Sequence, residues 1–172
     1  MKIAYTLAQQ TGGTNTTLET LATELLAQGL KLCGTVQIDT PKPGSHHCDM
    51  DVKVLPDGPI LRISQSLGEA ATGCRLDPAA LEQAVALTLK QIEQGADLLI
   101  INKFGKHEAD GRGFRAAIAE AAARDIPILV GTNALNEDAL RSFCGGEIRK
   151  MPADADALLN WVKTVVFSRQ AA

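Results

Sequence analysis

A short segment near the amino terminus combines glycines with small polar residues. It follows an apolar run at residues 2–7 and reads Gly12, Gly13, Thr14, Asn15, Thr16 and Thr17. Leu18, Leu21 and Leu25 then recur at three- and four-residue steps, which predicts a helix from about Thr16 onward. A helix N-terminus offers unpaired N–H groups and the positive end of the helix dipole. The segment therefore predicts an anion site, and a glycine turn without a ligand is the alternative.

Polar and cationic residues follow a second apolar run, at residues 98–101. They are Asn102, Lys103, Lys106 and Arg112, with Glu108 among them. A continuous apolar run of this length predicts a central parallel strand, and ligands of open α/β sheets bind beyond the carboxyl ends of such strands. The three cations would attract an anion, and an arginine fork suits tetrahedral oxyanions. The alternative is that the lysines are solvated and that Arg112 pairs with Glu108 or Asp110.

Two further groups of residues have the chemistry of ligands or catalysts. His46, His47 and Cys48 offer nitrogen and sulfur donors for zinc or a related metal, but adjacent ligands do not match the usual spacing, so a polar loop is the preferred interpretation. His107 and Glu108 resemble an acid–base pair, although neighbours in a helix or strand usually point apart. If the chain is an enzyme, Glu108 and Lys103 are the catalytic candidates.

Apolar periodicity places these residues within alternating strands and helices. Strands are expected at residues 2–7, 30–38, 98–101 and 126–130, and helices at 16–28, 78–94, 113–124, 136–143 and 154–166. The residues at 39–51 are expected to form an exposed loop, and 52–55 and 60–63 a β-hairpin around an Asp-Gly turn. This order predicts a three-layer α/β fold with a mainly parallel sheet and an inserted β-hairpin, in a single domain of residues 1–172.

Composition excludes several classes of protein. The 172 residues carry 17 Lys and Arg against 20 Asp and Glu, a net charge of −3, so a binder of nucleic acid is not expected. The sequence has no apolar run of 18 residues and no secretory signal pattern, so we expect no membrane insertion and a cytoplasmic location. The 4 cysteines form no C-x-x-C pair and are expected to be reduced thiols.

Several motifs carry a resemblance to known proteins. They are the segments at residues 48–51, 63–65, 73–77 and 102–108, with 111–114. With these motifs the chain resembles, over nearly its whole length, a bacterial family of unknown function that also occurs fused to molybdate-transporter ATPase subunits. More distantly, the first strand–helix unit, residues 25–35 and residues 96–132 resemble small P-loop nucleoside-triphosphatases. The resemblance implies a P-loop-like fold.

The distant resemblance also implies a changed phosphate site. Asn15 stands where the triphosphatases have the phosphate-loop lysine. Asn102 and Lys103 stand where they have the aspartate that helps to hold magnesium and the glutamate that orients water. Phosphoryl transfer depends on such positioning and charge stabilisation, so ordinary ATP or GTP hydrolysis and a magnesium cofactor are not expected. The exchanges at 102 and 103 make the site more positive, which favours a small anion.

These observations lead to one main functional hypothesis. The chain is expected to bind a nucleotide or small oxyanion as an accessory or sensor protein. The resemblance implies partners in molybdate transport or among molybdenum enzymes. One alternative is a nucleoside-triphosphatase or phosphohydrolase in which Lys103 or Lys106 replaces the lost lysine and Glu108 the lost carboxylate. The other is a protein-interaction module without a small ligand.

Overall fold

The fold is built on one central β-sheet. The computed structural model describes residues 2–8, 12–40, 49–65 and 76–170. Within these residues the strands are β1 (Ile3–Thr6), β2 (Leu32–Thr40), β3 (Asp49–Val54), β4 (Ile60–Arg62), β5 (Leu98–Phe104), β6 (Ile128–Thr132) and β7 (Arg149–Met151). The helices are α1 (Gly13–Ala27), α2 (Pro78–Gln94), α3 (Lys106–Ala109), α4 (Arg115–Ala123), α5 (Glu137–Phe143) and α6 (Ala155–Gln170).

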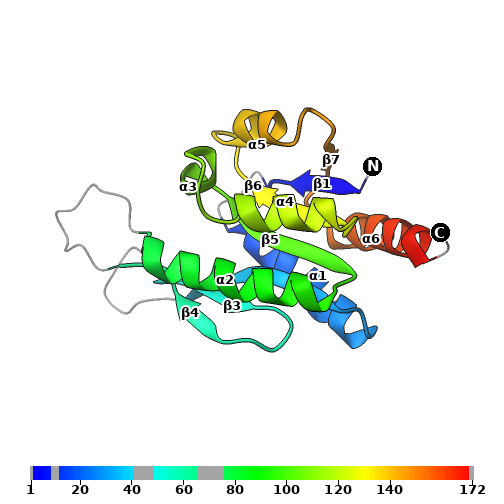
Figure 1. Ribbon diagram of the computed structural model, residues 1–172, viewed down its shortest axis with the longest axis horizontal. Helices are drawn as coiled ribbons and strands as arrows, with labels where there is room; N and C mark the ends of the chain where they lie inside the picture. The colour runs from blue at the N-terminus through cyan, green and yellow to red at the C-terminus, as the bar shows by residue number, and fades with distance from the viewer. Residues whose placement is uncertain (1, 9–11, 41–48, 66–75, 171–172) are drawn as a thin grey trace.

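The seven described strands lie in the order β4-β3-β2-β5-β6-β1-β7 (Figure 1). Five neighbouring strands of this sheet, β2, β5, β6, β1 and β7, are parallel to one another. β3 pairs antiparallel with both β2 and β4. The predicted α/β fold with a mainly parallel sheet is therefore confirmed. The predicted hairpin is also present, and it extends one edge of the sheet.

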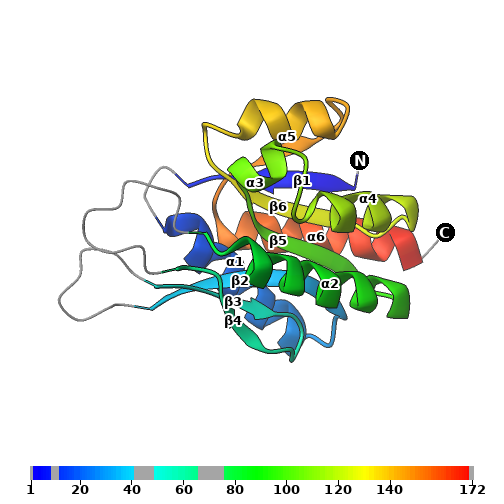
Figure 2. The same cartoon turned by 60° about the vertical axis from the view of Figure 1, so that its left-hand side comes forward.

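Helices cover both faces of the sheet. In Figure 2, α2 and α4 lie in front of the sheet and α1 and α6 behind it. Leu18, Leu21 and Leu25 of α1 are buried against Ile100 of β5 and Trp161 of α6, as the apolar spacing of α1 predicts. Alternate residues of the same strands, such as Leu99 and Ile101, face a second core under α2 and α4. The three-layer architecture follows from this two-sided burial.

The prediction of an exposed loop at residues 39–51 is wrong at both ends. β2 continues to Thr40 and β3 begins at Asp49, because these two residues pair across the antiparallel ladder. Strand pairing overrides the low β propensity of Asp39 and Asp49. Two elements were not predicted, β7 and the four-residue helix α3.

The long helices α1 and α2 begin in different ways. The carboxylate of Asp77 accepts hydrogen bonds from the N–H groups of Ala79 and Ala80, and Pro78 occupies the first turn of α2. Among the described residues, α1 has no such side-chain cap; Gly12 precedes it with φ of 79°. Within the described ranges, no helix is long and apolar enough to cross a membrane.

Candidate functional site

The residues predicted to bind an anion form the first turn of α1. We call residues 12–17 the glycine segment; α1 begins at Gly13, three residues earlier than expected. The first hydrogen bond of the helix joins Thr16 N to Gly12 O at 3.3 Å. The first N–H groups of a helix, here those of Gly13 and Thr14, have no acceptor within the helix, which is the usual state of a helix N-terminus.

Two side chains fix the backbone of the glycine segment. Thr14 Oγ1 accepts a hydrogen bond from Ala8 N at 2.8 Å. This bond connects the backbone just after β1 to the first turn of α1. Thr17 Oγ1 donates to Gly13 O at 2.9 Å. Gly12 has a positive backbone φ, a conformation that residues with a side chain rarely adopt, so glycine suits this position. The segment is thereby held in a defined conformation after β1.

A pair of asparagines joins the glycine segment to β5. Asn102 Nδ2 donates to Asn15 Oδ1 at 2.9 Å, and Asn102 Oδ1 accepts from Gln37 N of β2 at 2.9 Å. Only 3% of Asn102 is exposed. The structure thus brings together two predicted site residues that are 87 positions apart in the sequence. We call this contact the amide bridge.

The close approach of β6 completes this arrangement. A Cβ atom on Gly131 would lie 2.1 Å from Asn102 O and 2.9 Å from Thr14 Cγ2 and Leu18 Cδ1. Real Cβ atoms do not come this close to other heavy atoms. Glycine at this position therefore allows β5, β6 and the start of α1 to meet.

One buried polar atom beside this arrangement has no partner among the described residues. Thr6, the last residue of β1, is 0% exposed, and its Oγ1 makes no hydrogen bond within the described part of the chain. Ala4 and Met151 belong to the core under α1 and α6, so the alternation of β1 turns Thr6 to the same face. A buried hydroxyl without a partner costs about 1–3 kcal/mol, and such a group in a native structure calls for an explanation.

The predicted candidate Glu108 has a role in the segment after β5. Its Oε2 accepts from Gly105 N at 2.9 Å and its Oε1 from Phe114 N at 3.3 Å. The residue is 3% exposed. Burial raises the pKa of Glu108 above its ordinary value of 4.5, although the backbone hydrogen bonds act in the opposite direction. Glu108 therefore connects the two ends of residues 105–114, which contain α3 and which we call the α3 segment.

His107 does not pair with its sequence neighbour Glu108. His107 Nε2 lies 3.1 Å from Glu82 Oε1 of α2, and the same oxygen accepts from Gly113 N at 3.1 Å. His107 is buried and its partner half exposed. These contacts fasten the α3 segment to α2, on the face of the sheet opposite to α1.

The predicted cationic residues are exposed. Lys103 and Lys106 extend into solvent, and Arg112 lies 3.9 Å from Asp110. Among the described residues, no hydrogen bond or ion pair joins these three cations to the glycine segment. The structure therefore divides the predicted site into the glycine segment with Asn102 and a separate group of surface cations.

Comparison with known proteins places the chain in a family. Residues 3–161 match the family model described as a protein of unknown function, DUF2478. The chain belongs to the DUF2478 family. The described elements from β1 to the middle of α6 lie within the matched range.

A curated relative extends this assignment. This DUF2478 chain is 34% identical over 145 residues to molybdenum import ATP-binding protein ModC 2 of Bradyrhizobium diazoefficiens. The match covers 84% of this chain and 16% of the relative. The chain therefore spans about a sixth of the length of the curated relative.

Solved structures share the fold. A human cancer-related nucleoside triphosphatase superposes with a TM-score of 0.64, at 16% identity over 100% of this chain and 99% of that one. THEP1 from the hyperthermophile Aquifex aeolicus gives a TM-score of 0.63, at 15% identity over 96% and 99% of the two chains. The predicted P-loop-like fold is confirmed by these two likenesses, which concern the fold alone.

The described residues of the DUF2478 chain do not fit a magnesium ion at the amide bridge. Asn15 and Asn102 carry no charge, and Mg²⁺ in proteins is usually bound through carboxylates and substrate phosphates. In the described part of the chain no group of three or more His, Cys, Asp or Glu residues is placed to hold a metal. The candidates His46, His47 and Cys48 lie outside the described residues.

Two residues of this site were missed by sequence reasoning. In the sequence, Thr6 lies within the apolar run at residues 2–7, and Gly131 directly follows the strand predicted at residues 126–130. Thr6 is the final residue of a strand that precedes the glycine segment. A polar residue at this position is the sequence feature that could have indicated a site residue. Gly131 has no signal in a single sequence, because its requirement comes from atoms of β5 and α1.

Proposed function

We propose that this DUF2478 domain binds a tetrahedral oxyanion at the glycine segment, either free or as the phosphate of a nucleotide. Binding requires no magnesium, and the protein acts as an accessory or sensor rather than as a hydrolase. The observation that carries the proposal is the amide bridge between Asn15 and Asn102 at the N-terminus of a long helix.

The ligand-binding chemistry comes from the start of α1. The N–H groups of Gly13 and Thr14 have no acceptor within the helix, and the helix dipole adds about half a positive charge there. The unpartnered hydroxyl of Thr6 supplies a further donor beside the segment. Together these groups favour an anion with several acceptor oxygens.

The same site is poor for catalysis. Phosphoryl transfer needs positive charge on the transferring group and a group that orients the nucleophile. The amide bridge supplies neither a lysine nor a carboxylate, and the buried Glu108 already binds two backbone N–H groups. An oxyanion bound here would be held without being activated.

A connection with molybdenum is part of the proposal. The relative in Bradyrhizobium diazoefficiens is named a molybdenum import ATP-binding protein. Molybdate is a tetrahedral oxyanion, and a helix N-terminus such as that of the glycine segment favours anions. We therefore propose components of molybdate transport or molybdenum enzymes as partners, and molybdate as the first free oxyanion to test.

Isothermal titration calorimetry in the presence of EDTA tests this function. Phosphate, molybdate and ATP are titrated separately, so that a free oxyanion and a nucleotide phosphate are distinguished. We expect saturable binding of at least one of the three without magnesium. Absence of binding by all three overturns the proposal.

A threonine variant tests the placement of the ligand. Thr6→Val removes the unpartnered hydroxyl without breaking a hydrogen bond, so the fold is retained and affinity falls roughly tenfold. Thr88→Val is the matched control, because Thr88 is equally buried but bonds within α2. Unchanged affinity in Thr6→Val would exclude Thr6 from the site. Magnesium-dependent phosphate release that is lost in Lys103→Ala would instead support the hydrolase alternative.

A further inference from the structure

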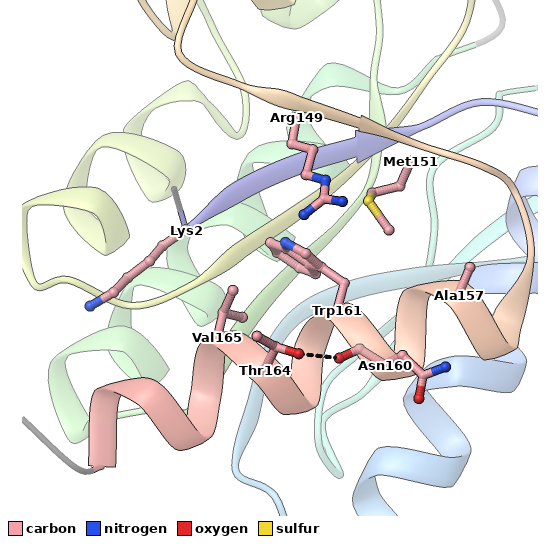
Figure 3. A pocket seen from close by; sticks show the side chains of 8 residues that line it. All are labelled: Lys2, Arg149, Met151, Ala157, Asn160, Trp161, Thr164 and Val165. Atoms are coloured by element: carbon pink, nitrogen blue, oxygen red, sulfur yellow. Dashed lines mark hydrogen bonds between the residues drawn. The ribbon is translucent and has the colours of Figure 1, made fainter.

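A cavity of about 460 Å³ lies between α6 and the edge of the sheet formed by β1 and β7 (Figure 3). Arg149, Met151 and Lys2 line it from the sheet side, and Trp161, Asn160 and Val165 from α6. Lys2 precedes β1 and Arg149 begins β7, so the cavity includes the amino-terminal ends of the strands. The glycine segment follows the opposite end of β1, where Met151 of the cavity pairs with Thr6. As described, the lining of the cavity includes no residue of the glycine segment or of the amide bridge.

Two hydrogen-bond donors meet in the cavity. In Figure 3 the guanidinium of Arg149 extends from β7 towards the indole ring of Trp161. Within the described residues, neither the guanidinium of Arg149 nor the indole N–H of Trp161 has a hydrogen-bond or ion-pair partner. A guanidinium presents a planar fork that matches a carboxylate in two parallel hydrogen bonds. The indole N–H adds a third donor of the same kind.

The charge of the cavity favours a monoanion. Lys2 also lines it, but Lys2 Nζ forms an ion pair with Asp125 and points away from Arg149 in Figure 3. Among the described residues that line the cavity, one cation, Arg149, is left to neutralise a ligand. A phosphate dianion would keep an uncompensated charge, whereas a single carboxylate would be matched.

The cavity also has apolar lining. Met151, Trp161 and Val165 contribute thioether, aromatic and aliphatic surface, and Asn160 and Thr164 are polar residues of the same lining. A ligand that fills this space gains free energy by burying its own apolar surface. Small-molecule sites commonly combine such walls with a few converging polar groups.

We propose that this cavity binds a small carboxylate with an apolar body. The carboxylate binds the fork of Arg149 and the indole N–H of Trp161, and the apolar body packs against Met151 and Val165. The proposed carboxylate is a different ligand from the oxyanion proposed at the glycine segment.

The single tryptophan of the chain, Trp161, reports on this site directly. Benzoate is the probe, and the intrinsic fluorescence of the full chain is followed during its titration. Benzyl alcohol has the same ring without the charge, and acetate has the charge without the ring. We expect saturable quenching or enhancement by benzoate, and binding roughly tenfold weaker for each of the two control compounds.

Variants of β7 complete the test. Arg149→Gln removes the charge of an exposed side chain, and we expect it to weaken benzoate binding roughly tenfold or more. Arg149→Lys keeps the charge but loses the planar fork of the guanidinium, so we expect it to weaken benzoate binding as well. Lys150→Gln is the matched control, because the neighbouring Lys150 pairs with Glu137 and lies outside the cavity. It should bind benzoate as the unaltered chain does.

Equilibrium dialysis with labelled benzoate provides a second measurement that does not depend on fluorescence. Absence of saturable binding in both measurements overturns the proposal. Equal affinity of Arg149→Gln and the unaltered chain also overturns it, and so does equal binding of acetate and benzoate.

Discussion

The amide bridge is a neutral contact between the start of α1 and β5. Asn102 is 3% exposed and satisfies Gln37 N as well as Asn15 Oδ1. Its amide therefore stabilises the ends of β2, β5 and α1 without the desolvation cost of buried charges.

Changing the charges of this bridge tests that interpretation. Asn102→Asp places a carboxylate at the buried position and turns a donor into an acceptor, so we expect the free energy of unfolding to fall by about 1–3 kcal/mol. The double variant Asn15→Lys with Asn102→Asp restores an opposite-charge pair and should recover at least about 0.5 kcal/mol relative to additivity. Urea unfolding measures both. Strict additivity of the two single effects would contradict a direct contact.

Glu108 gives a prediction about pH. Burial raises its pKa in the folded chain above the ordinary value of 4.5, so the folded state binds the proton more strongly than the unfolded state. The contribution of Glu108 to stability therefore falls as pH rises from about 4.5 through its folded pKa. Glu108→Gln removes this titration. Thermal unfolding measures the difference in stability between the unaltered chain and Glu108→Gln. This difference should favour the unaltered chain more at about pH 4 than at about pH 7. A difference that favours the unaltered chain more as pH rises would contradict the account.

At the scale of elements, the contact between β5, β6 and α1 depends on the missing side chain of Gly131. Gly131→Ala would bring a methyl group within 2.1 Å of the Asn102 carbonyl oxygen. Because backbone must move to relieve this contact, we expect a loss of about 1–3 kcal/mol and weaker oxyanion binding. Gly105→Ala is the control: its Cβ would meet Glu108 Oε2 at an ordinary 3.7 Å, and its φ is negative. Equal denaturation midpoints for the two variants would contradict this explanation.

The sequence predicts those elements that have a repeating apolar pattern. The leucines of α1 and the apolar run of β5 identify their elements because burial on one stripe or on both faces leaves a period in the sequence. β7 has three residues, Arg149, Lys150 and Met151, and no such pattern. Its place beside β1 is set by pairing with a distant strand, which a local pattern does not contain.

The candidate site shows the same limit. The sequence predicts Asn15 and Asn102 as site residues because each follows a predicted strand, and parallel strands end at a common edge of the sheet. In the structure β5 continues to Phe104, so Asn102 lies within the strand. That the two amides meet, and that Glu108 instead binds Gly105 and Phe114, depends on side-chain directions. Those directions follow from packing and not from spacing in the sequence.

At the scale of the whole molecule, both cores cover the two faces of one continuous sheet. β5 contributes Ile100 to one core and Leu99 to the other, so neither core can be lost alone. We therefore propose that residues 1–172 unfold as one domain in a single cooperative transition. The fluorescence of Trp161 and far-ultraviolet circular dichroism should give coincident urea curves, and separated midpoints would contradict a single domain.

The most direct test of the central claim is a titration of the ¹⁵N-labelled chain with phosphate, molybdate or ATP in EDTA, followed by amide NMR. We expect saturable shifts centred on the backbone amides of Gly12 to Thr17 and on the side-chain amide of Asn102. A chain that shows no saturable shift with any of the three, or shifts only at residues remote from the glycine segment, would contradict the proposed oxyanion site.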